Sequence, residues 1–384
     1  MSLEGIKKLK ILKHGNDRRF EIPTPRSPMR VHLLPADNAA IAAPFWAAVE
    51  SSQEMHRPAV SWVWTSAWLR HFGDTVTARF ALVERQGEPV GAALLTLSAR
   101  SRLRTRKLHL GTAGEPSGEG VYVEYNDVLC APEDRADVLF TLLRAVREEP
   151  GWDELDLPGM RPEAATAIAR ALPARQKPHA SWTLRLHPDS SVVESLKGPV
   201  GRLVRQARKS LEPGPAELVQ DLALAGDVMD EMALLHQVRW EAAGKPGVLA
   251  GRRLRGFLDD LVQEWLPSGK IMLHRLPDPS GKALGCVVGF VEGGRFLYYQ
   301  AGFQRFPDNR KRAGLLCHVE FAETCRRLGM TEYEFLAGDA RYKRQLSGNE
   351  ANTLYWSTWR RPSMRNSALD VARTVRDTAR RVSH

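Results

Sequence analysis

Cysteine is scarce in this chain of 384 residues, and its four cysteines lie far apart. None forms a CxxC pair or joins histidines at the spacing of a zinc site, which argues against a disulfide framework and against structural zinc. Because free cysteine is usually a buried residue, we expect reduced, structural thiols and no bound metal. The four residues are Cys130, Cys286, Cys317 and Cys325.

Long apolar runs are also missing. The longest, around residues 283–291, is about half the length that a membrane-spanning helix needs. Lysines interrupt every apolar pair in the first twenty residues, so these residues lack the apolar core of a secretory signal. We therefore expect a cytoplasmic protein.

Several well-known catalytic motifs do not occur. The chain has no GxSxG, HExxH, GxGxxG or P-loop sequence, so serine hydrolases, zinc proteases, dinucleotide-binding folds and NTPases lose their usual support. An enzyme built from this sequence is expected to work without a metal or a strong nucleophile.

The composition, in contrast, is that of an ordinary globular protein, with 43% hydrophobic and 26% charged residues. A chain of this length exceeds the usual size of a single hydrophobic core, so two domains are expected. The net charge of +10 favours polyanionic partners such as a nucleotide-bearing cofactor, an anionic glycan precursor, tRNA or an anionic membrane surface.

The two halves of the chain repeat one pattern. Residues 80–99 and residues 271–291 each consist of two apolar runs around a tight turn, as in a β-hairpin. Residues 121–159 and residues 295–339 then share the order strand, proline-containing loop, amphipathic helix and strand. The repeat predicts an α/β fold of two tandem domains, each a mixed, mostly antiparallel sheet flanked by helices.

Three helical segments separated by glycine and proline lie between the copies, at residues 192–214, 227–244 and 252–266. Both ends of the chain are basic; the C-terminal helix could meet an anionic membrane or a partner helix, or dock on its own domain. The expected organisation is a mobile N-terminal arm (1–28), an N-terminal domain (29–190), a catalytic C-terminal domain (191–361) and a basic C-terminal helix (362–384).

A basic turn precedes the helix of the second copy. Arg310, Lys311 and Arg312 lead directly into Gly314 and the first helical turn. Free backbone N–H groups and the positive end of the helix dipole make such a start a phosphate site, and the three cations add to it. A solvated basic loop is the alternative interpretation.

This order of hairpin, strand, basic loop and helix is similar to the acyl-CoA-binding core of GNAT acetyltransferases. In that family the loop before the helix has the form Q/R-x-x-G-x-G/A and holds the cofactor pyrophosphate. Lys311 and Gly314 match this form, whereas Leu316 departs from it. The resemblance implies acyl-CoA (acetyl-CoA) as the donor, with Arg310, Lys311, Arg312 and Gly314 as its binding residues.

Four further segments resemble the CelD branch of the superfamily and the related Fem-type peptidyltransferases, which carry two such folds in tandem. The most specific is Gly338-Asp339 followed by Tyr342-Lys343, which follows the G-D-x-x-Y-K pattern of that branch. The four segments are residues 61–74, 201–214, 234–244 and 335–348.

The residues of this motif are the catalytic candidates. Asp339 and Lys343 are four apart, just beyond a short apolar strand, where open α/β sheets place their ligands. Asp339 could orient or deprotonate an acceptor ammonium, and Lys343 could hold an acceptor anion or a developing oxyanion. The resemblance adds Tyr342. A structural ion pair of Asp339 with Lys343 is the alternative interpretation.

Other residues are expected to bind the acceptor. Basic residues of the segment 192–214 share a helix face that could carry phosphates of an acceptor or of tRNA, or could simply be solvated. The helical segment at residues 227–244 is expected to cover the cleft, and the strand at residues 298–303 is expected to line it. The expected substrate-binding residues are Arg205, Arg208, Lys209, Arg239, Trp240 and Tyr299.

Three functions remain open from the sequence. The first is transfer of an acyl group from acyl-CoA to an amine or hydroxyl of a small molecule, a glycan precursor or a lipid head group. The second is Fem-type aminoacyl transfer from charged tRNA, which the net charge and the basic helix face favour. The third is a non-catalytic binding module that uses the groove between the halves.

Overall fold

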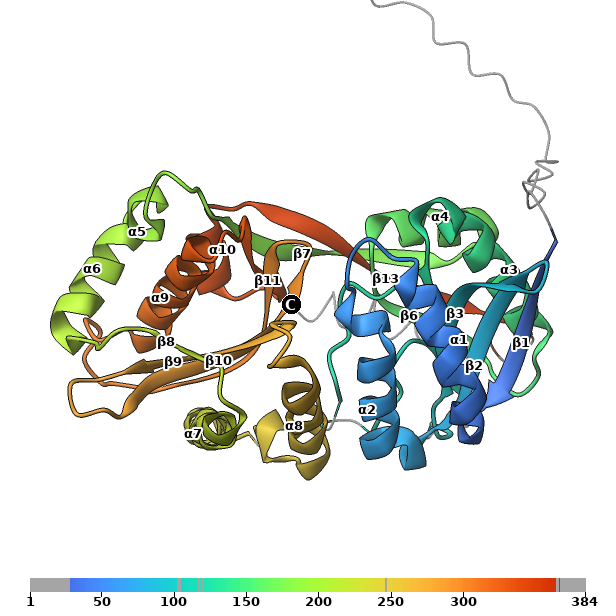
Figure 1. The fold of residues 1–384 in the computed structure, drawn as a ribbon, viewed down its shortest axis with the longest axis horizontal. Coiled ribbons are helices and arrows are strands. Elements are labelled where there is room, and N and C mark those ends of the chain that lie inside the picture. The colour runs from blue at the N-terminus through green and yellow to red at the C-terminus, as the bar shows by residue number, and fades with distance from the viewer. Residues whose placement is uncertain are drawn as a thin grey trace, which may run out of the picture.

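The computed structural model describes residues 28–101, 105–116, 118, 120–245, 247–363 and 366 (Figure 1). Nearly all of the expected N-terminal arm and of the expected C-terminal helix lies outside the described residues. Within the described part of the chain, no helix is long and apolar enough to cross a membrane. The four cysteines are buried and free.

The expected mixed, mostly antiparallel sheet is confirmed, and both halves of the chain share it. Only β4 with β6 and β11 with β12 pair in parallel among its strands; the short strand β5 (Leu129–Cys130) pairs with β3 off the main path. In spatial order the strands are β1 (Met29–Pro35), β2 (Thr77–Arg85), β3 (Glu88–Leu97), β4 (Lys107–Leu110), β6 (Glu154–Met160), β13 (Ala351–Arg360), β7 (Arg175–Arg185), β12 (Glu332–Ala337), β11 (Arg295–Phe303), β10 (Ala283–Glu292), β9 (Ile271–Pro277) and β8 (Glu217–Val219).

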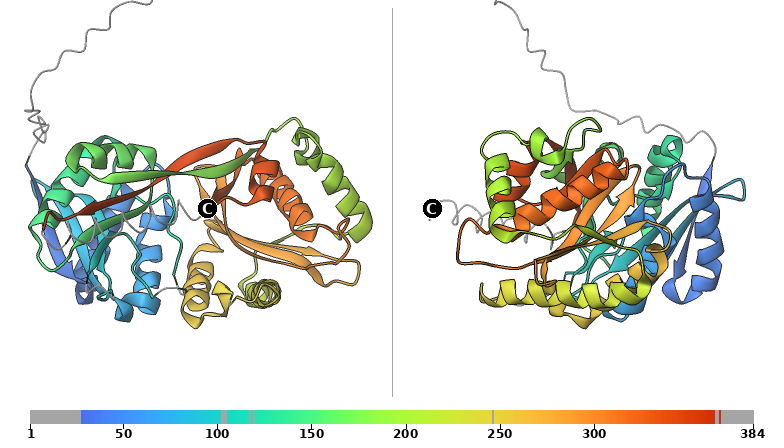
Figure 2. Two further views of the ribbon diagram at one scale, coloured as in Figure 1. Left: turned by 180° about the vertical axis from the view of Figure 1, so that it is seen from behind. Right: turned by 60° about the vertical axis from the view of Figure 1, so that its left-hand side comes forward.

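The two halves exchange their last strands at the centre of the sheet. β7 belongs to the first half by sequence but pairs with β12 of the second half, whereas β13, from the end of the second half, pairs with β6 of the first. β7 and β13 also pair with each other, and Figure 2 shows both strands crossing from one half to the other. The predicted boundary at residue 190 therefore divides the chain but not the sheet.

Helices cover both faces of the sheet. On one face a continuous apolar core spans the two halves; Trp64 packs edge-on against Phe257 and Phe290, with ring centroids 5.0 Å and 5.3 Å away. This core joins α1 (Ala39–Ser51), α2 (Trp62–Phe72), α7 (Leu222–Glu241) and α8 (Arg252–Trp265). The other face carries α3 (Arg135–Glu148) and α4 (Pro162–Ala171) in the first half, and α5 (Val192–Ser195), α6 (Val200–Leu211), α9 (Ala313–Arg327) and α10 (Arg341–Ser347) in the second.

One predicted strand is wrong. The sequence predicts a strand at the start of residues 121–159 as the counterpart of β11, but only Leu129–Cys130 of that stretch is a strand. The counterpart of β11 is β4, because β4 pairs in parallel with β6 as β11 pairs with β12. The alternating apolar residues of 121–128 are nevertheless largely buried, because this segment packs at the junction of the halves.

Candidate functional site

The second half contains a pair of parallel strands that diverge. β11 and β12 are paired over only three residues each, Arg295–Leu297 with Glu332–Glu334. Beyond this point β11 continues to Phe303 without a parallel partner from β12. A register shift against β10 also leaves Tyr299 as a bulge, since Tyr298 and Gln300 face consecutive residues of β10. Such bulges bend a strand and are frequent beside active sites.

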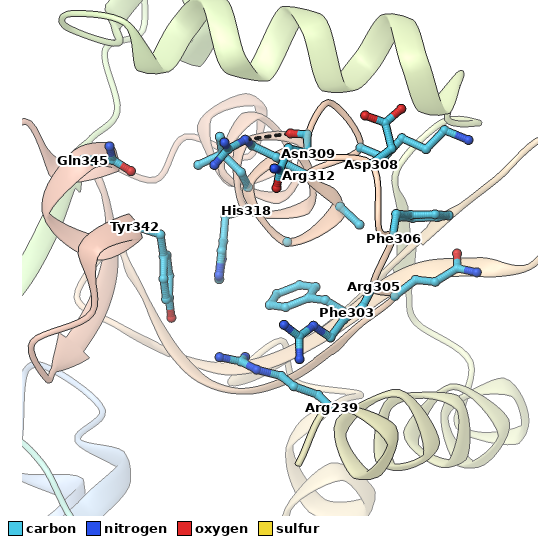
Figure 3. A pocket seen from close by; sticks show the side chains of 15 residues that line it. Arg239, Phe303, Arg305, Phe306, Asp308, Asn309, Arg312, His318, Tyr342 and Gln345 are labelled. Carbon is cyan, nitrogen blue, oxygen red and sulfur yellow. Dashed lines mark hydrogen bonds between the residues drawn. The ribbon is translucent and has the colours of Figure 1, made fainter. Parts of the chain in front are cut away.

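A pocket of about 420 Å³ lies at this opening (Figure 3). Its walls come from the end of β11, the following loop, the start of α9, α10 and the end of α7. Its lining includes Arg239, Phe303, Phe306, Lys311, Arg312, Gly314, His318 and Tyr342.

The predicted basic turn forms the rim of the pocket. α9 begins after Arg312 with no side-chain cap, so its first N–H groups are available to a ligand. Lys311 and Arg312 line the pocket. The exposed Arg310, in contrast, is bound to the carboxylate of Asp308 at 3.0 Å. The structure thus brings two of the three predicted cations to the pocket.

Gly314 permits close packing at this helix start. A Cβ atom at this position would lie 3.1 Å from the ring of Phe303, closer than most real contacts. The glycine therefore lets the end of β11 lie directly against the first turn of α9, and both residues line the pocket.

The inner wall of the pocket is aromatic and neutral. His318 is 1% exposed, and its burial lowers its pKa to about 3, so the ring is neutral at pH 7. Its Nδ1 lies 3.1 Å from the hydroxyl of Tyr333, and its Nε2 has no hydrogen-bond partner within the described part of the chain. Tyr342 lies on the same wall, and burial raises the pKa of its phenol, so this hydroxyl stays protonated.

Asp339 and Lys343 do not form a pair with each other. The Asp339 side chain is 83% exposed and contacts Arg344 at 3.2 Å. Lys343 instead folds back to the end of β12, where its Nζ donates to the carbonyl of Ala337 at 2.8 Å. Burial lowers the pKa of Lys343. Neither residue is part of the pocket lining.

The predicted substrate-binding residues fall in three places. Arg239 lines the pocket, and the neighbouring Trp240 donates its indole N–H to His236 at 2.9 Å. Tyr299 is partly buried on the opposite side of β11, in a second cleft described below. The cations of α6 are exposed and lie outside the lining of the pocket; Arg208 pairs with Glu320 of α9, while Arg205 and Lys209 are solvent-facing.

The second cleft lies at the junction of the halves. It is narrow, about 20 Å³, and brings Glu124 of the first half beside Tyr299 and Leu336 of the second. The Ala337 N–H donates to Glu124 Oε2 at 2.7 Å. Burial and the nearby Glu334 raise the pKa of Glu124 to about 7, although this hydrogen bond and Lys343 oppose the shift.

Sequence reasoning did not identify Glu124 or His318. His318 could have been found, because it is four residues after Gly314 on a predicted helix and so falls on the same face. Glu124 carries no comparable signal, since its segment resembles an ordinary strand.

In the first half, the space between β4 and β6 is equivalent to the opening between β11 and β12, and the side chain of Asn126 fills it. The Asn126 side chain donates from Nδ2 to the carbonyl of Leu110, in β4, at 2.8 Å and to that of Pro158, in β6, at 3.0 Å. The turn before α3 also carries Glu133 and Asp134 in place of cations, which would repel a phosphate. The two halves therefore differ at the equivalent place, and the basic opening belongs to the second.

No group of three or more histidine, cysteine, aspartate or glutamate side chains arranged to hold a metal ion occurs among the residues that the structure describes.

Comparisons with known proteins agree with this geometry. Residues 201–344 match the family model of the acetyltransferase (GNAT) domain, which confirms the predicted resemblance to GNAT acyltransferases. No curated protein matches the chain by sequence.

Solved structures share the fold at low sequence identity. The structure of FemX has a TM-score of 0.53 and 12% identity, over 82% of this chain and 95% of that one. The C-terminal domain of a putative lysylphosphatidylglycerol synthetase from Agrobacterium fabrum has a TM-score of 0.51 and 13% identity, over 87% and 95%. L-PGS from Bacillus licheniformis has a TM-score of 0.50 and 10% identity, over 80% and 95%.

Proposed function

We propose that the chain, whose residues 201–344 match the acetyltransferase (GNAT) domain, transfers an acyl group from acyl-CoA to an amine or hydroxyl acceptor. The observation that carries the proposal is the pocket at the diverging end of β11 and β12, which combines a basic rim, an uncapped helix start and a protonated tyrosine.

The rim supports a phosphorylated donor. Lys311, Arg312 and the first N–H groups of α9 would hold its phosphates, because cations and helix starts both favour anions. The orphaned Nε2 of buried His318 gives the inner wall one polar group for an amide or carbonyl of the donor chain. Together these features fit acyl-CoA, a phosphate-bearing molecule with a long amide-containing arm.

The chemistry would then depend on positioning and proton transfer. The acyl carbonyl carbon is attacked by the acceptor, and main-chain N–H groups at the Tyr299 bulge are candidates to stabilise the oxyanion. Tyr342, which stays protonated, can give a proton to the departing thiolate. Most of the rate enhancement in such a reaction comes from holding donor and acceptor together.

Aminoacyl transfer from charged tRNA is the second candidate function. Its support is the exposed basic face of α6, where Arg205 and Lys209 face solvent, because such a face could follow a nucleic-acid backbone. The fold likeness to FemX agrees with either donor.

We propose the class of acceptor from the same comparisons. A small molecule, a glycan precursor or a lipid head group would each fit a transferase of this fold, and the likeness to a putative lysylphosphatidylglycerol synthetase keeps a lipid head group among them. We also propose a cytoplasmic location, where both candidate donors occur.

Calorimetric titration of the purified chain with acetyl-CoA, and separately with aminoacyl-tRNA, distinguishes the candidates. Acetyl-CoA binding followed by thiol release in the presence of an amine supports the first function. Binding of aminoacyl-tRNA alone would favour the second. A chain that binds acetyl-CoA but never turns it over with any acceptor would be a binding module.

A further inference from the structure

We propose that Glu124, a residue of the first half, is a catalytic base of the site in the second half, and that it takes up the proton lost by an acceptor amine. The inference rests on the proposed acyl transfer. It assigns a chemical task to the first half, whose own strand gap is closed by Asn126.

Glu124 is tied to the end of β12. Its Oε2 accepts from the Ala337 N–H at 2.7 Å. This N–H turns toward Glu124 where β12 is distorted: the register against β7 shifts between Glu334 and Ala337, and Leu336 has a φ of +60°. A left-handed leucine is uncommon, and such strain persists where the surrounding structure enforces it, often at functional sites.

The end of β12 separates the pocket from the cleft. Tyr342 lines the pocket, whereas the next residue, Lys343, binds the carbonyls of Leu336 and Ala337. Leu336 in turn lines the cleft beside Glu124. An acyl group held between the diverging strands would therefore have Tyr342 on one side and Glu124 on the other.

The cleft suits the reacting end of an amine. Its volume of about 20 Å³ is room for roughly one water-sized group. Trp64, Tyr122 and Tyr299 form aromatic walls around the carboxylate, and aromatic faces attract an ammonium ion. Tyr122 is 66% exposed, which places this wall at the surface, where an acceptor can enter.

The charges around Glu124 suit proton uptake near neutral pH. Burial raises its pKa to about 7, with Lys343 and the Ala337 N–H lowering the pKa and Glu334 raising it. Arg161 and Glu292 also line the cleft and form an ion pair with each other, and Arg295 pairs with the same carboxylate. A base whose pKa lies near neutral pH can take up the acceptor's proton and release it again at that pH.

Glu124 and Tyr342 together account for every proton that moves during acyl transfer. The acceptor ammonium gives one proton to Glu124, and the freed electron pair on nitrogen forms the new C–N bond. The C–S bond then breaks with its electron pair on sulfur. Sulfur takes the Tyr342 proton, Tyr342 recovers a proton from the new amide nitrogen, and Glu124 later releases its proton to solvent.

The test compares Glu124→Gln with wild type in thiol release from acetyl-CoA. Ethanolamine, lysine and glucosamine serve as amine probes, and the most active one is carried forward. We expect kcat/KM to fall by about 10²- to 10⁴-fold and the rise of the pH profile near pH 7 to disappear. Acetyl-CoA affinity should stay unchanged, because the pocket rim is intact. Equal rates and equal pH profiles would overturn the proposal.

Glu50→Gln is the matched control, because Glu50, like Glu124, is a half-buried carboxylate that accepts a main-chain N–H, that of Trp62 at 2.9 Å, and has a raised pKa. It should keep wild-type kinetics. Should Glu124→Gln fail to fold, Glu124→Asp retains a carboxylate and should show a reduced rate with a pH-dependent rise; a pH-independent rate in this variant would overturn the role. A wild-type chain that neither binds acetyl-CoA nor releases thiol would overturn the proposed function itself.

Discussion

The rings of His318 and Tyr342 are stacked in the pocket wall, with centroids 5.1 Å apart and planes inclined by 11°. Protonation of His318 would place an unsolvated charge beneath Tyr342, which explains why burial lowers the pKa of the histidine to about 3. The folded state therefore favours the neutral ring.

This stacking predicts an acid-sensitive fold. Because the folded pKa of His318 is below the ordinary value of 6.5, its contribution to stability is complete above pH 6.5 and is lost as pH falls toward 3. The loss amounts to about 2 to 3 kcal/mol at pH 4.5. In urea unfolding at pH 7 and pH 4.5, His318→Phe should lose less stability between the two pH values than wild type. His187 is exposed, so His187→Phe should retain the wild-type difference; an unchanged difference in His318→Phe would contradict the account.

Gly302 sets the approach of β11 to α7, which brings Arg239 to the pocket. A Cβ atom at Gly302 would lie 2.2 Å from the carbonyl oxygen of Met232, and backbone cannot yield as a flexible side chain can. Gly302→Ala should therefore lower the free energy of unfolding by about 1 to 3 kcal/mol or more and weaken donor binding. Gly226, in α7 itself, has open space around it, so Gly226→Ala should stabilise the chain by up to about 1 kcal/mol. Chemical denaturation of both variants checks the contrast, and a neutral Gly302→Ala would refute it.

Asp339 and Lys343 should behave differently although one motif contains both. The exposed Asp339 pairs with Arg344 on the surface, and such pairs contribute about 0 to 1 kcal/mol. Asp339→Asn should thus melt like wild type and keep a turnover within about twofold, because Glu124 is the base that we propose. Lys343→Met should melt earlier, since it leaves two carbonyls of β12 without their donor. Melting curves beside thiol-release rates test this, and a large loss of turnover in Asp339→Asn would return the role of base to that residue.

The sequence predicted those parts of the fold that depend on local pattern. The hairpins at residues 80–99 and 271–291 and the helix starting after Arg312 are present, because alternation, turn residues and helical spacing determine them locally. The exchange of β7 and β13 could not be predicted, since strand pairing over such separations depends on the whole chain. Residues 121–125 show alternating burial like a strand. The Glu124 side chain nevertheless bonds across the junction to Ala337, and the Asn126 side chain bonds to Leu110 within the first half.

The candidate site, like the fold, could be predicted where it depends on local sequence. The sequence indicated the basic turn, Gly314, Arg239 and Tyr342, and the structure brings Lys311 and Arg312 of that turn together with the other three in one pocket. Glu124 could not, because its position near Ala337 depends on contact between the two halves. The cations of α6 share a helix face as expected, but that face is not part of the pocket.

The central claim is that one donor binds at the opening between β11 and β12. Calorimetric titration of the full chain with acetyl-CoA, at low and at physiological salt, tests it most directly. The account predicts one site per chain, because Asn126 closes the gap in the first half. The double variant Lys311→Ala with Arg312→Ala should bind at least tenfold more weakly with a smaller salt dependence, whereas Arg310→Ala, whose side chain is bound to Asp308, should bind nearly as wild type. Two sites per chain, or a double variant with unchanged affinity, would contradict the account.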